Sequence, residues 1–255
     1  MSAEAYLEQV NALVARIEST QLPAIREAAQ RMAESIAVGR AVHLFGSGHS
    51  VIPVLDIFPR YGSFVGFHPI MDPRLMWFNV VGPGGARELL WLERQEGYIA
   101  QVLLSYHLDP RDTMLIFSHG GLNAAPVEMA LAAKEQGLTV VAVTSLANHR
   151  ASAATHSSGK RLADVADIAI DNCVDPEDAA VQIEGRREKV AALSTVAAVT
   201  ISMALVAEVA RELAARDVSF PTFVSPNVPG VDPEHNKWVF QEYTAFIRQL
   251  GDPTG

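Results

Sequence analysis

Glycine and hydroxyl-bearing residues gather in two short segments, and the first of them follows the apolar run at residues 41–45. That segment consists of Gly46, Ser47, Gly48, His49 and Ser50. Glycine lets a backbone approach a ligand closely, and the free amides at the start of a helix point toward negative charge. The segment therefore predicts a binding site for a monophosphate or a sugar hydroxyl.

A second segment of the same character follows the apolar run at residues 113–118. It contributes Ser118, His119, Gly120, Gly121 and Asn123. A helical pattern over residues 125–137 begins directly after it, so this segment also predicts a loop that leads into a helix. Two such loops at neighbouring strand ends can hold opposite parts of one ligand.

The first segment does not have the pattern of a nucleotide-binding loop. It lacks the third glycine of G-x-G-x-x-G, and residues 64–69 offer no acidic side chain that could bind a ribose. No Gly-Lys-Ser or Gly-Lys-Thr follows at the place that a Walker loop requires. A site for a phosphate or a sugar, without a nucleotide, is the interpretation that remains.

These loops need a scaffold of alternating strands and helices to position them. Short apolar runs typical of buried parallel strands lie at residues 41–45, 113–118, 138–144 and 166–170. Helical patterns at residues 96–108 and 125–137 separate them. The alternation predicts an α/β fold with a doubly wound, mostly parallel sheet flanked by helices, whose ligands bind at the carboxyl ends of the strands.

Helical patterns also precede and follow this core. Residues 4–38 have apolar residues at helical spacing, and we expect Pro23 to divide them into two helices. Residues 186–215 predict a long alanine-rich helix. The proline-rich residues 221–236 predict a loop, and residues 237–250 predict a last helix.

The length and composition fit one large domain. A chain of 255 residues, of which 49% are hydrophobic, can fill a sizeable core. With no linker and no internal repeat in the sequence, we expect a single domain over residues 1–255. It would consist of a helical arm (1–38), a core (39–215) and a C-terminal loop and helix (216–255).

Charge and composition exclude several classes of partner. The formal net charge of −9, with no basic stripe, argues against a nucleic-acid surface. The N-terminus has acidic residues where a signal peptide carries positive charge, and no apolar run reaches the length of a membrane span. We therefore expect a cytoplasmic protein without a membrane partner, and the single cysteine, Cys173, excludes an internal disulfide.

Three stretches, FGSGHS, SHGGLN and GKRLADVADIAIDN, together resemble the sugar isomerase (SIS) domain superfamily and its bacterial phosphosugar-binding proteins. The resemblance covers roughly residues 38–172 and continues toward the EHN near the end. It implies a flavodoxin-like fold, a sugar or sugar phosphate as ligand, and a homodimer or homotetramer with active sites where subunits meet. It also implies that Ser194 and Thr195, at the start of the long helix, lie near the ligand.

The second loop departs from the pattern of the superfamily. That pattern usually reads Ser-x-Ser-Gly-x-Thr, whereas this chain has Gly120 in place of the second serine and Asn123 in place of the threonine. One phosphate-binding hydroxyl is therefore missing. Backbone amides could bind a phosphate without it, or the ligand could be a sugar with another anionic group.

The resemblance implies aldose–ketose isomerisation, in which a base moves a proton between the first two carbons of an opened sugar through an enediol. The His and Glu that phosphoheptose isomerases of the superfamily place after the first loop are replaced here by Asp56 and Arg60. We therefore expect the catalytic groups elsewhere. Our candidates are Glu184 as the base and His235, from its own or a neighbouring subunit, as the partner in proton transfer.

Two other functions stay open, a non-catalytic regulatory protein that binds sugar phosphates and an amino-sugar deaminase or lyase. Residues 79–93 predict a loop and helix over the site, where Arg87 or the nearby Arg94 could bind an anion. We expect no cofactor. We also expect no metal, because the histidines lack a His-x-x-x-His pairing or a carboxylate triad of zinc spacing.

Overall fold

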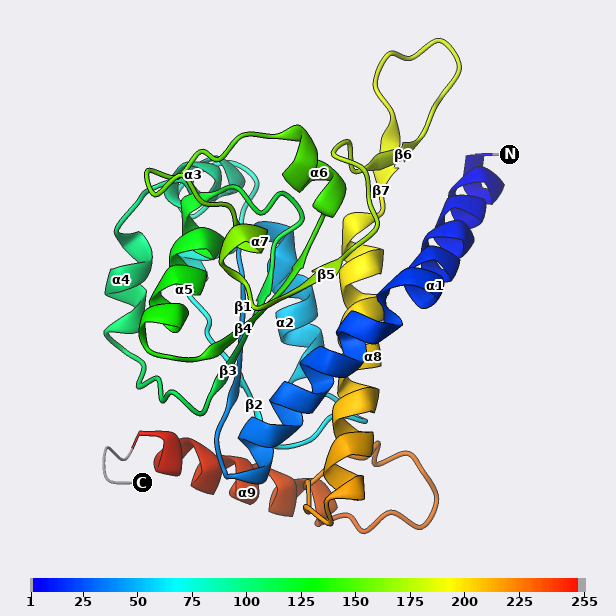
Figure 1. The fold of residues 1–255 in the computed structure, drawn as a ribbon. Coiled ribbons are helices and arrows are strands. Elements are labelled where there is room, and N and C mark those ends of the chain that lie inside the picture. The colour runs from blue at the N-terminus through cyan, green and yellow to red at the C-terminus, as the bar shows by residue number, and fades with distance from the viewer. Residues whose placement is uncertain (1, 252–255) are drawn as a thin grey trace.

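The computed structural model describes residues 2–251, and its centre is a five-stranded parallel sheet in the order β2-β1-β3-β4-β5 (Figure 1). The strands are β1 (Val42–Gly46), β2 (Phe67–Pro69), β3 (Thr113–Phe117), β4 (Thr139–Thr144) and β5 (Ile168–Asp171). Each of the four runs predicted as strands is present. Residue 1 and residues 252–255, which the domain prediction includes, lie outside the described residues.

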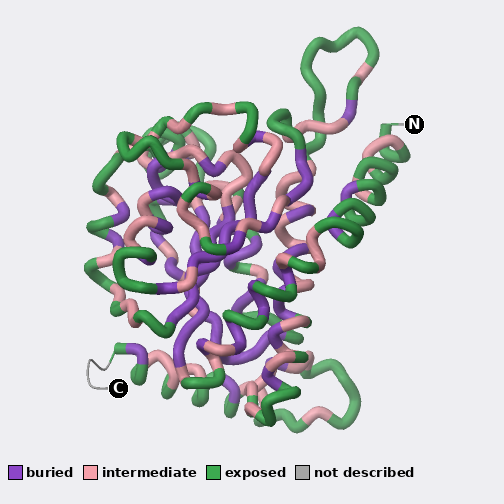
Figure 2. The backbone as a smooth tube through the Cα atoms, in the orientation of Figure 1, coloured by how far each residue is buried: buried purple, intermediate pink, exposed green. Residues whose placement is uncertain are grey.

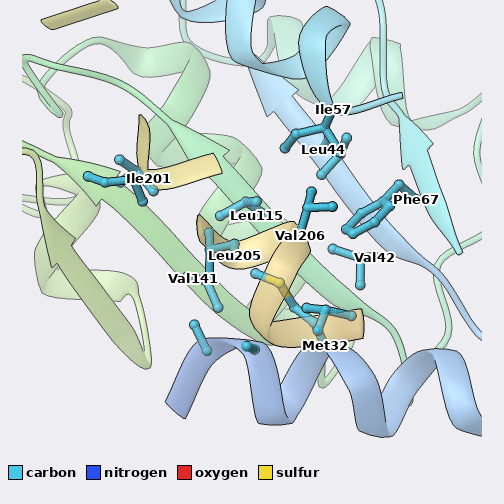
Figure 3. Packing of buried hydrophobic residues seen from close by; sticks show 14 of the residues in the cluster. Met32, Val42, Leu44, Ile57, Phe67, Leu115, Val141, Ile201, Leu205 and Val206 are labelled. Carbon is cyan, nitrogen blue, oxygen red and sulfur yellow. The ribbon is translucent and has the colours of Figure 1, made fainter. Parts of the chain in front are cut away.

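Helices cover both faces of the sheet, because successive strand residues point to opposite sides. Leu44 of β1 packs into one core and Phe45 into the other. The first core is completed by α1 (Ser2–Ala37), α2 (Val51–Ile57) and α8 (Ser194–Ala215). Figure 3 shows Met32 of α1 and Leu205 of α8 in this core. The second core is completed by α3 (Ala86–Leu92), α4 (Tyr98–Leu103), α5 (Ala124–Glu135) and α7 (Leu162–Val165).

This architecture confirms the predicted fold class, a doubly wound parallel sheet with helical extensions at both ends. From β1 the chain goes to β2 on one side of the sheet, and from β3 it goes to β4 on the other. β1 and β3 are paired in parallel, with Gly46 opposite Phe117, so the loops that follow them leave the same edge side by side. In open α/β sheets this point of divergence is where ligands bind.

The prediction that Pro23 divides residues 4–38 into two helices is wrong. α1 continues through the proline, although its ribbon changes direction partway along (Figure 1). Ile17 before the proline and Ile25 after it are both buried in the first core. This burial on both sides outweighs the backbone hydrogen bond that proline removes.

The prediction of a helix over residues 186–215 is wrong in its first part. β6 (Ala179–Val181) and β7 (Val190–Ala192) form an antiparallel hairpin whose tip projects from the molecule and is exposed (Figures 1 and 2). α8 begins only at Ser194, because the Asp178 carboxylate accepts the backbone N–H groups of Leu193 (2.9 Å) and Ser194 (2.7 Å). These donors have no partner within the helix, and their capping fixes its start.

The C-terminal part matches its prediction closely, with a loop before α9 (His235–Leu250). The helix predicted over residues 96–108 is shorter in the structure, where α4 ends at Leu103. Three short elements complete the fold, namely the 3-10 turns Gly48–Ser50 and Pro73–Leu75 and the helix α6 (Leu146–Ala151). Within residues 2–251, no helix is long and apolar enough to cross a membrane.

Candidate functional site

Two adjoining hollows lie at the loops after β1 and β3, the smaller beside the first turn of α8 and the larger beside α3. The smaller one, here called the inner recess, has about 280 Å³ of empty space and includes Asn172, Ser194 and Thr195 in its lining. The larger one, the outer pocket, has about 700 Å³ and includes Trp77 and Glu93. Both are lined by His49, Ser50, Ser118 and His119, so they form two parts of one site.

The structure brings together most of the residues predicted to bind substrate. Ser47, Gly48, His49, Ser50, Ser118, His119, Gly120, Asn123, Ser194 and Thr195 all line one or both hollows. They meet because β1 pairs with β3 and because α8 starts beside the ends of these strands. Their contact with a ligand stays a prediction.

The two remaining glycines shape the loops from outside the lining. A Cβ atom on Gly46 would lie 2.1 Å from the backbone oxygen of Ser50, so the first loop folds directly back on the end of β1. Gly121 has a φ of +63°, and a Cβ atom there would lie 2.7 Å from Thr144 Oγ1. Both positions therefore require glycine for the shape of the site.

Glu93 is the acidic side chain of the outer pocket, and the sequence analysis did not single it out. Its side chain hydrogen-bonds both loops, since Oε2 accepts from Ser47 Oγ (2.9 Å) and Oε1 accepts from Asn123 Nδ2 (2.8 Å). The residue is 7% exposed. Burial raises the pKa of the Glu93 carboxyl above its ordinary value, and the hydrogen bond from Ser47 partly opposes this.

Helical spacing holds a signal that could have identified Glu93. Glu93 lies one turn after Leu89, and its backbone N–H donates to the Leu89 carbonyl (2.9 Å). Both residues are buried, so a carboxylate continues the buried face of α3. An acidic residue on the apolar face of a helix beside a predicted site is therefore a candidate for function.

His119 lies between the two hollows. Its backbone carbonyl accepts the N–H of Ser145 (3.0 Å), and its ring Nδ1 pairs with Nδ2 of Asn172 (3.0 Å). Its Nε2 is buried and has no hydrogen-bond partner among the described residues. The ring of His49, from the first loop, instead packs edge-on against Trp77, with centroids 4.6 Å apart.

The two residues predicted as catalytic lie away from these hollows. Glu184 is exposed in the loop between β6 and β7, and it lines neither hollow. His235 begins α9, at the opposite end of the molecule in Figure 1, and its Nε2 donates to the Thr222 carbonyl (2.7 Å). Within one chain neither residue joins the loops, because the hairpin and the C-terminal loop carry them elsewhere.

The lining of the site contains no Lys or Arg among residues 2–251. Arg87 and Arg94, predicted as candidates for anion binding, line a neighbouring surface hollow with Trp91, outside the lining of the two hollows. Asp56 and Arg60 pair with each other at the end of α2. An anion in the site would therefore be bound by hydroxyls, amides and imidazoles.

We find no group of three or more His, Cys, Asp or Glu side chains placed to hold a metal ion in the part of the chain that the structure describes. The polar groups of the site are instead arranged for hydrogen bonding. Two loops with free hydroxyls and a buried carboxylate are suited to holding a polyhydroxylated molecule and moving one of its protons.

Comparison with known proteins agrees with the fold. Residues 5–145 match the family model of the SIS domain. A UPF0309 protein from Caldanaerobacter subterraneus subsp. tengcongensis is 37% identical over 248 residues, which cover 96% of this chain and 98% of that protein. A UPF0309 protein from Thermoanaerobacter pseudethanolicus is 34% identical over 249 residues, with the same coverage.

Two solved structures share the fold at low sequence identity. Phosphoheptose isomerase GmhA from Neisseria gonorrhoeae superposes with a TM-score of 0.55 and 12% identity, over 81% of this chain and 97% of that one. A phosphoheptose isomerase from Francisella tularensis gives a TM-score of 0.51 and 16% identity, over 82% and 96%. From its matched domain and its relatives over nearly the whole length, the chain belongs to the UPF0309 family of SIS-domain proteins.

Proposed function

We propose that the protein is a sugar isomerase that moves a proton between neighbouring carbons of an opened, anionic sugar, with Glu93 as the base. The observation that carries this proposal is the Glu93 carboxylate, which is buried in the outer pocket and bonded to both loops. Membership of the SIS-domain family supports it, because the solved structures that share the fold include two phosphoheptose isomerases.

The environment of Glu93 suits a base for a weakly acidic C–H group. A general base works best when its pKa is near the working pH, and burial raises the pKa of the Glu93 carboxyl in that direction. The hydrogen bonds from Ser47 and Asn123 hold both carboxylate oxygens in fixed places. Such fixed geometry favours proton transfer, because the base need not reorient when the substrate binds.

One carboxylate can both remove the proton from C2 and return it to C1. With an aldose, Glu93 accepts the C2 proton, the C–H electrons form the C1–C2 double bond, and the carbonyl electrons move to O1. The hydroxyl hydrogen on O2 then passes to O1. Glu93 returns its proton to C1, O2 becomes the carbonyl oxygen, and the protein is unchanged at the end of the cycle.

The anionic group of the substrate would bind to the loops without a cationic side chain. Ser118 Oγ accepts the backbone N–H of Gly121 (3.1 Å), which leaves the hydroxyl hydrogen of Ser118 for a ligand oxygen. Ser47 and Asn123, by contrast, already donate to Glu93. The second loop and Ser50 are therefore the proposed contacts of a phosphate, with Ser194 and Thr195 near the sugar.

Ligand binding is tested first, by thermal unfolding against hexose and pentose phosphates, amino-sugar phosphates, sulfonated sugars and their uncharged parents. A ligand at about 100 times its dissociation constant adds roughly 2.7 kcal/mol of stability. We expect only phosphorylated or other anionic members to raise the unfolding midpoint. A response to uncharged sugars alone would contradict an anionic substrate.

Turnover is then tested with the Glu93→Gln variant, using the panel member that raises the midpoint most. We expect this variant to lose isomerisation by about 10²–10⁴-fold, the usual contribution of a general base, while its ligand-induced midpoint shift stays. The matched control is Glu135→Gln, an exposed carboxylate on α5, which should keep wild-type turnover. Binding without turnover in the wild type would instead indicate a regulatory protein.

A further inference from the structure

We infer that His119 presents a fixed Nε2–H group to the substrate oxygen that becomes negative during the reaction, and that Asn172 is the positioning residue that fixes it. The reaction step in this inference rests on the proposed function. The direction of the hydrogen bond between Asn172 and His119 rests on contacts within the protein, and it can be tested without a substrate.

The orientation of the Asn172 amide is set by its own surroundings. Asn172 is 2% exposed and follows β5 directly. Its backbone N–H donates to the Thr144 carbonyl (2.9 Å), and its Oδ1 accepts the backbone N–H of Val174 (3.1 Å). A reversed amide would place two donors against each other at Val174, so the NH₂ group faces His119.

This orientation decides which ring nitrogen of His119 carries the hydrogen. Asn172 Nδ2 lies 3.0 Å from His119 Nδ1 and can only donate. Nδ1 must therefore accept, and in the neutral imidazole the hydrogen lies on Nε2. The hydrogen bond between Asn172 Oδ1 and the Val174 N–H thus selects the tautomer of His119 that carries its hydrogen on Nε2.

The Nε2–H group has no acceptor within the described part of the protein. Nε2 is buried, yet no protein atom accepts its hydrogen. A buried donor without a partner is unfavourable, and a ligand oxygen in the hollows that His119 lines would relieve that cost. The geometry therefore points to a position beside His119 where a ligand oxygen would accept this hydrogen.

Glu93 and His119 line the same outer pocket, so one substrate can meet both. When Glu93 removes the C–H proton, negative charge develops on the neighbouring carbonyl oxygen. A donor held in advance stabilises that charge, and the absence of Lys and Arg from the described lining makes this donor important. The hydrogen stays on His119, which only donates a hydrogen bond.

The first test is the tautomer of His119 in the ligand-free protein, measured by long-range ¹H–¹⁵N correlation on ¹⁵N-labelled material. We expect a hydrogen on Nε2 and a bare Nδ1, with the signals assigned by their loss in His119→Gln. In Asn172→Asp the carboxylate can only accept, so the hydrogen should move to Nδ1. A wild-type ring with its hydrogen on Nδ1 overturns the inference, whatever the turnover.

The second test compares two amide replacements, on the aldose of the panel that the wild type converts. Gln at position 119 extends an N–H₂ group toward the place of Nε2, whereas Asn extends it only toward the place of Nδ1. We expect His119→Asn to lower kcat by about 10²–10³-fold and His119→Gln to lose less. Equal losses of kcat in His119→Asn and His119→Gln overturn the role of the Nε2–H group. Isomerisation at the wild-type rate by Glu93→Gln overturns the proposed function and leaves the tautomer result standing.

Discussion

Glu93 depends on the first loop for its ionisation as well as for its position. The hydroxyl of Ser47 donates to Oε2 (2.9 Å) and favours the charged carboxylate, against the burial that raises its pKa. Ser47 thus adjusts the ionisation of the proposed base, although the sequence pattern alone predicted it as a contact of the substrate. A hydroxyl in a glycine loop can serve the protein's own carboxylate as readily as a ligand.

Removing this hydroxyl should shift the pH dependence of the reaction. In Ser47→Ala the charged form of Glu93 loses a hydrogen bond, so the pKa of the carboxyl rises further. Because the base must be ionised, the acidic limb of the kcat/KM profile should move to higher pH. The profile is measured on the best substrate of the panel.

Ser47→Thr serves as the control for that shift, because it keeps the hydroxyl, and the extended backbone of Ser47 (φ −122°, ψ 152°) accepts a β-branched side chain. Its acidic limb should stay at the wild-type position. An unchanged limb in Ser47→Ala would show that a group other than Glu93 limits the rate at low pH.

The sequence predicted the loops of this site better than its charged groups. Glycines and serines after an apolar run indicate a loop, so the loops at Gly46 and Ser118 could be recognised directly. Glu93 and Asn172 make the contacts on which their proposed roles rest only when segments distant in sequence meet in the fold. Glu184, an acidic residue beside a predicted helix, had no such contact to distinguish it.

At the scale of elements, the start of α8 depends on one side chain outside the helix. Asp178 accepts the backbone N–H groups of Leu193 and Ser194, and its Oδ2 also accepts the Ser194 hydroxyl (2.6 Å). The same turn of α8 supplies Ser194 and Thr195 to the inner recess. The cap therefore supports both the helix and the site.

Loss of this cap should destabilise the protein measurably. We expect Asp178→Ala to lower the free energy of unfolding by about 1–2 kcal/mol in urea titrations, as for other helix N-caps. The neighbouring Asp175 is exposed, so Asp175→Ala should change the value by less than about 0.5 kcal/mol. Equal effects of the two changes would contradict the capping role.

The elements that sequence patterns placed wrongly share one physical cause. Pro23 predicts a break, and residues 186–193 continue the pattern of a helix, when each is judged from its neighbours alone. In the fold, burial of Ile17 and Ile25 holds α1 together, and the pairing of β6 with β7 extends the chain before α8. Tertiary contacts overrode local preference at both positions.

For the whole molecule, several large apolar side chains are exposed in the segment that follows Trp77 and on α3. Trp77 lines the outer pocket, and the residues just after it include Phe78 (73% exposed) and Val81 (80% exposed), with Trp91 of α3 62% exposed. Large apolar side chains exposed in this number on one part of a chain are typical of protein interfaces. Their exposure supports the proposal that the protein is a homodimer or homotetramer.

The assembly is measured by light scattering of the purified protein across a dilution series. We expect a mass of two or four chains, falling only at the lowest concentrations. A single-chain mass at micromolar concentration would contradict the proposal. It would also remove the route by which His235 of a neighbouring subunit could approach this site.

The overall architecture could be predicted because several independent patterns agreed. Short apolar runs, helices between them and glycine loops at their ends together specify a doubly wound sheet, and the observed strand order fits that topology. The packing of α1 and α9 on the core supports the proposal of one domain over the described residues. Contacts between copies leave no comparable pattern in one sequence.

Gly46 has a further consequence for the thermodynamics of recognition. The first loop turns back so tightly that even a single carbon atom on Gly46 would lie 2.1 Å from the Ser50 oxygen. We expect so tight a loop to be ordered before a ligand binds, so that a ligand gives up its own freedom without ordering the loop as well. The entropy lost in shaping this half of the site would then belong to folding, and we expect association to proceed as the docking of a small molecule onto a preformed surface.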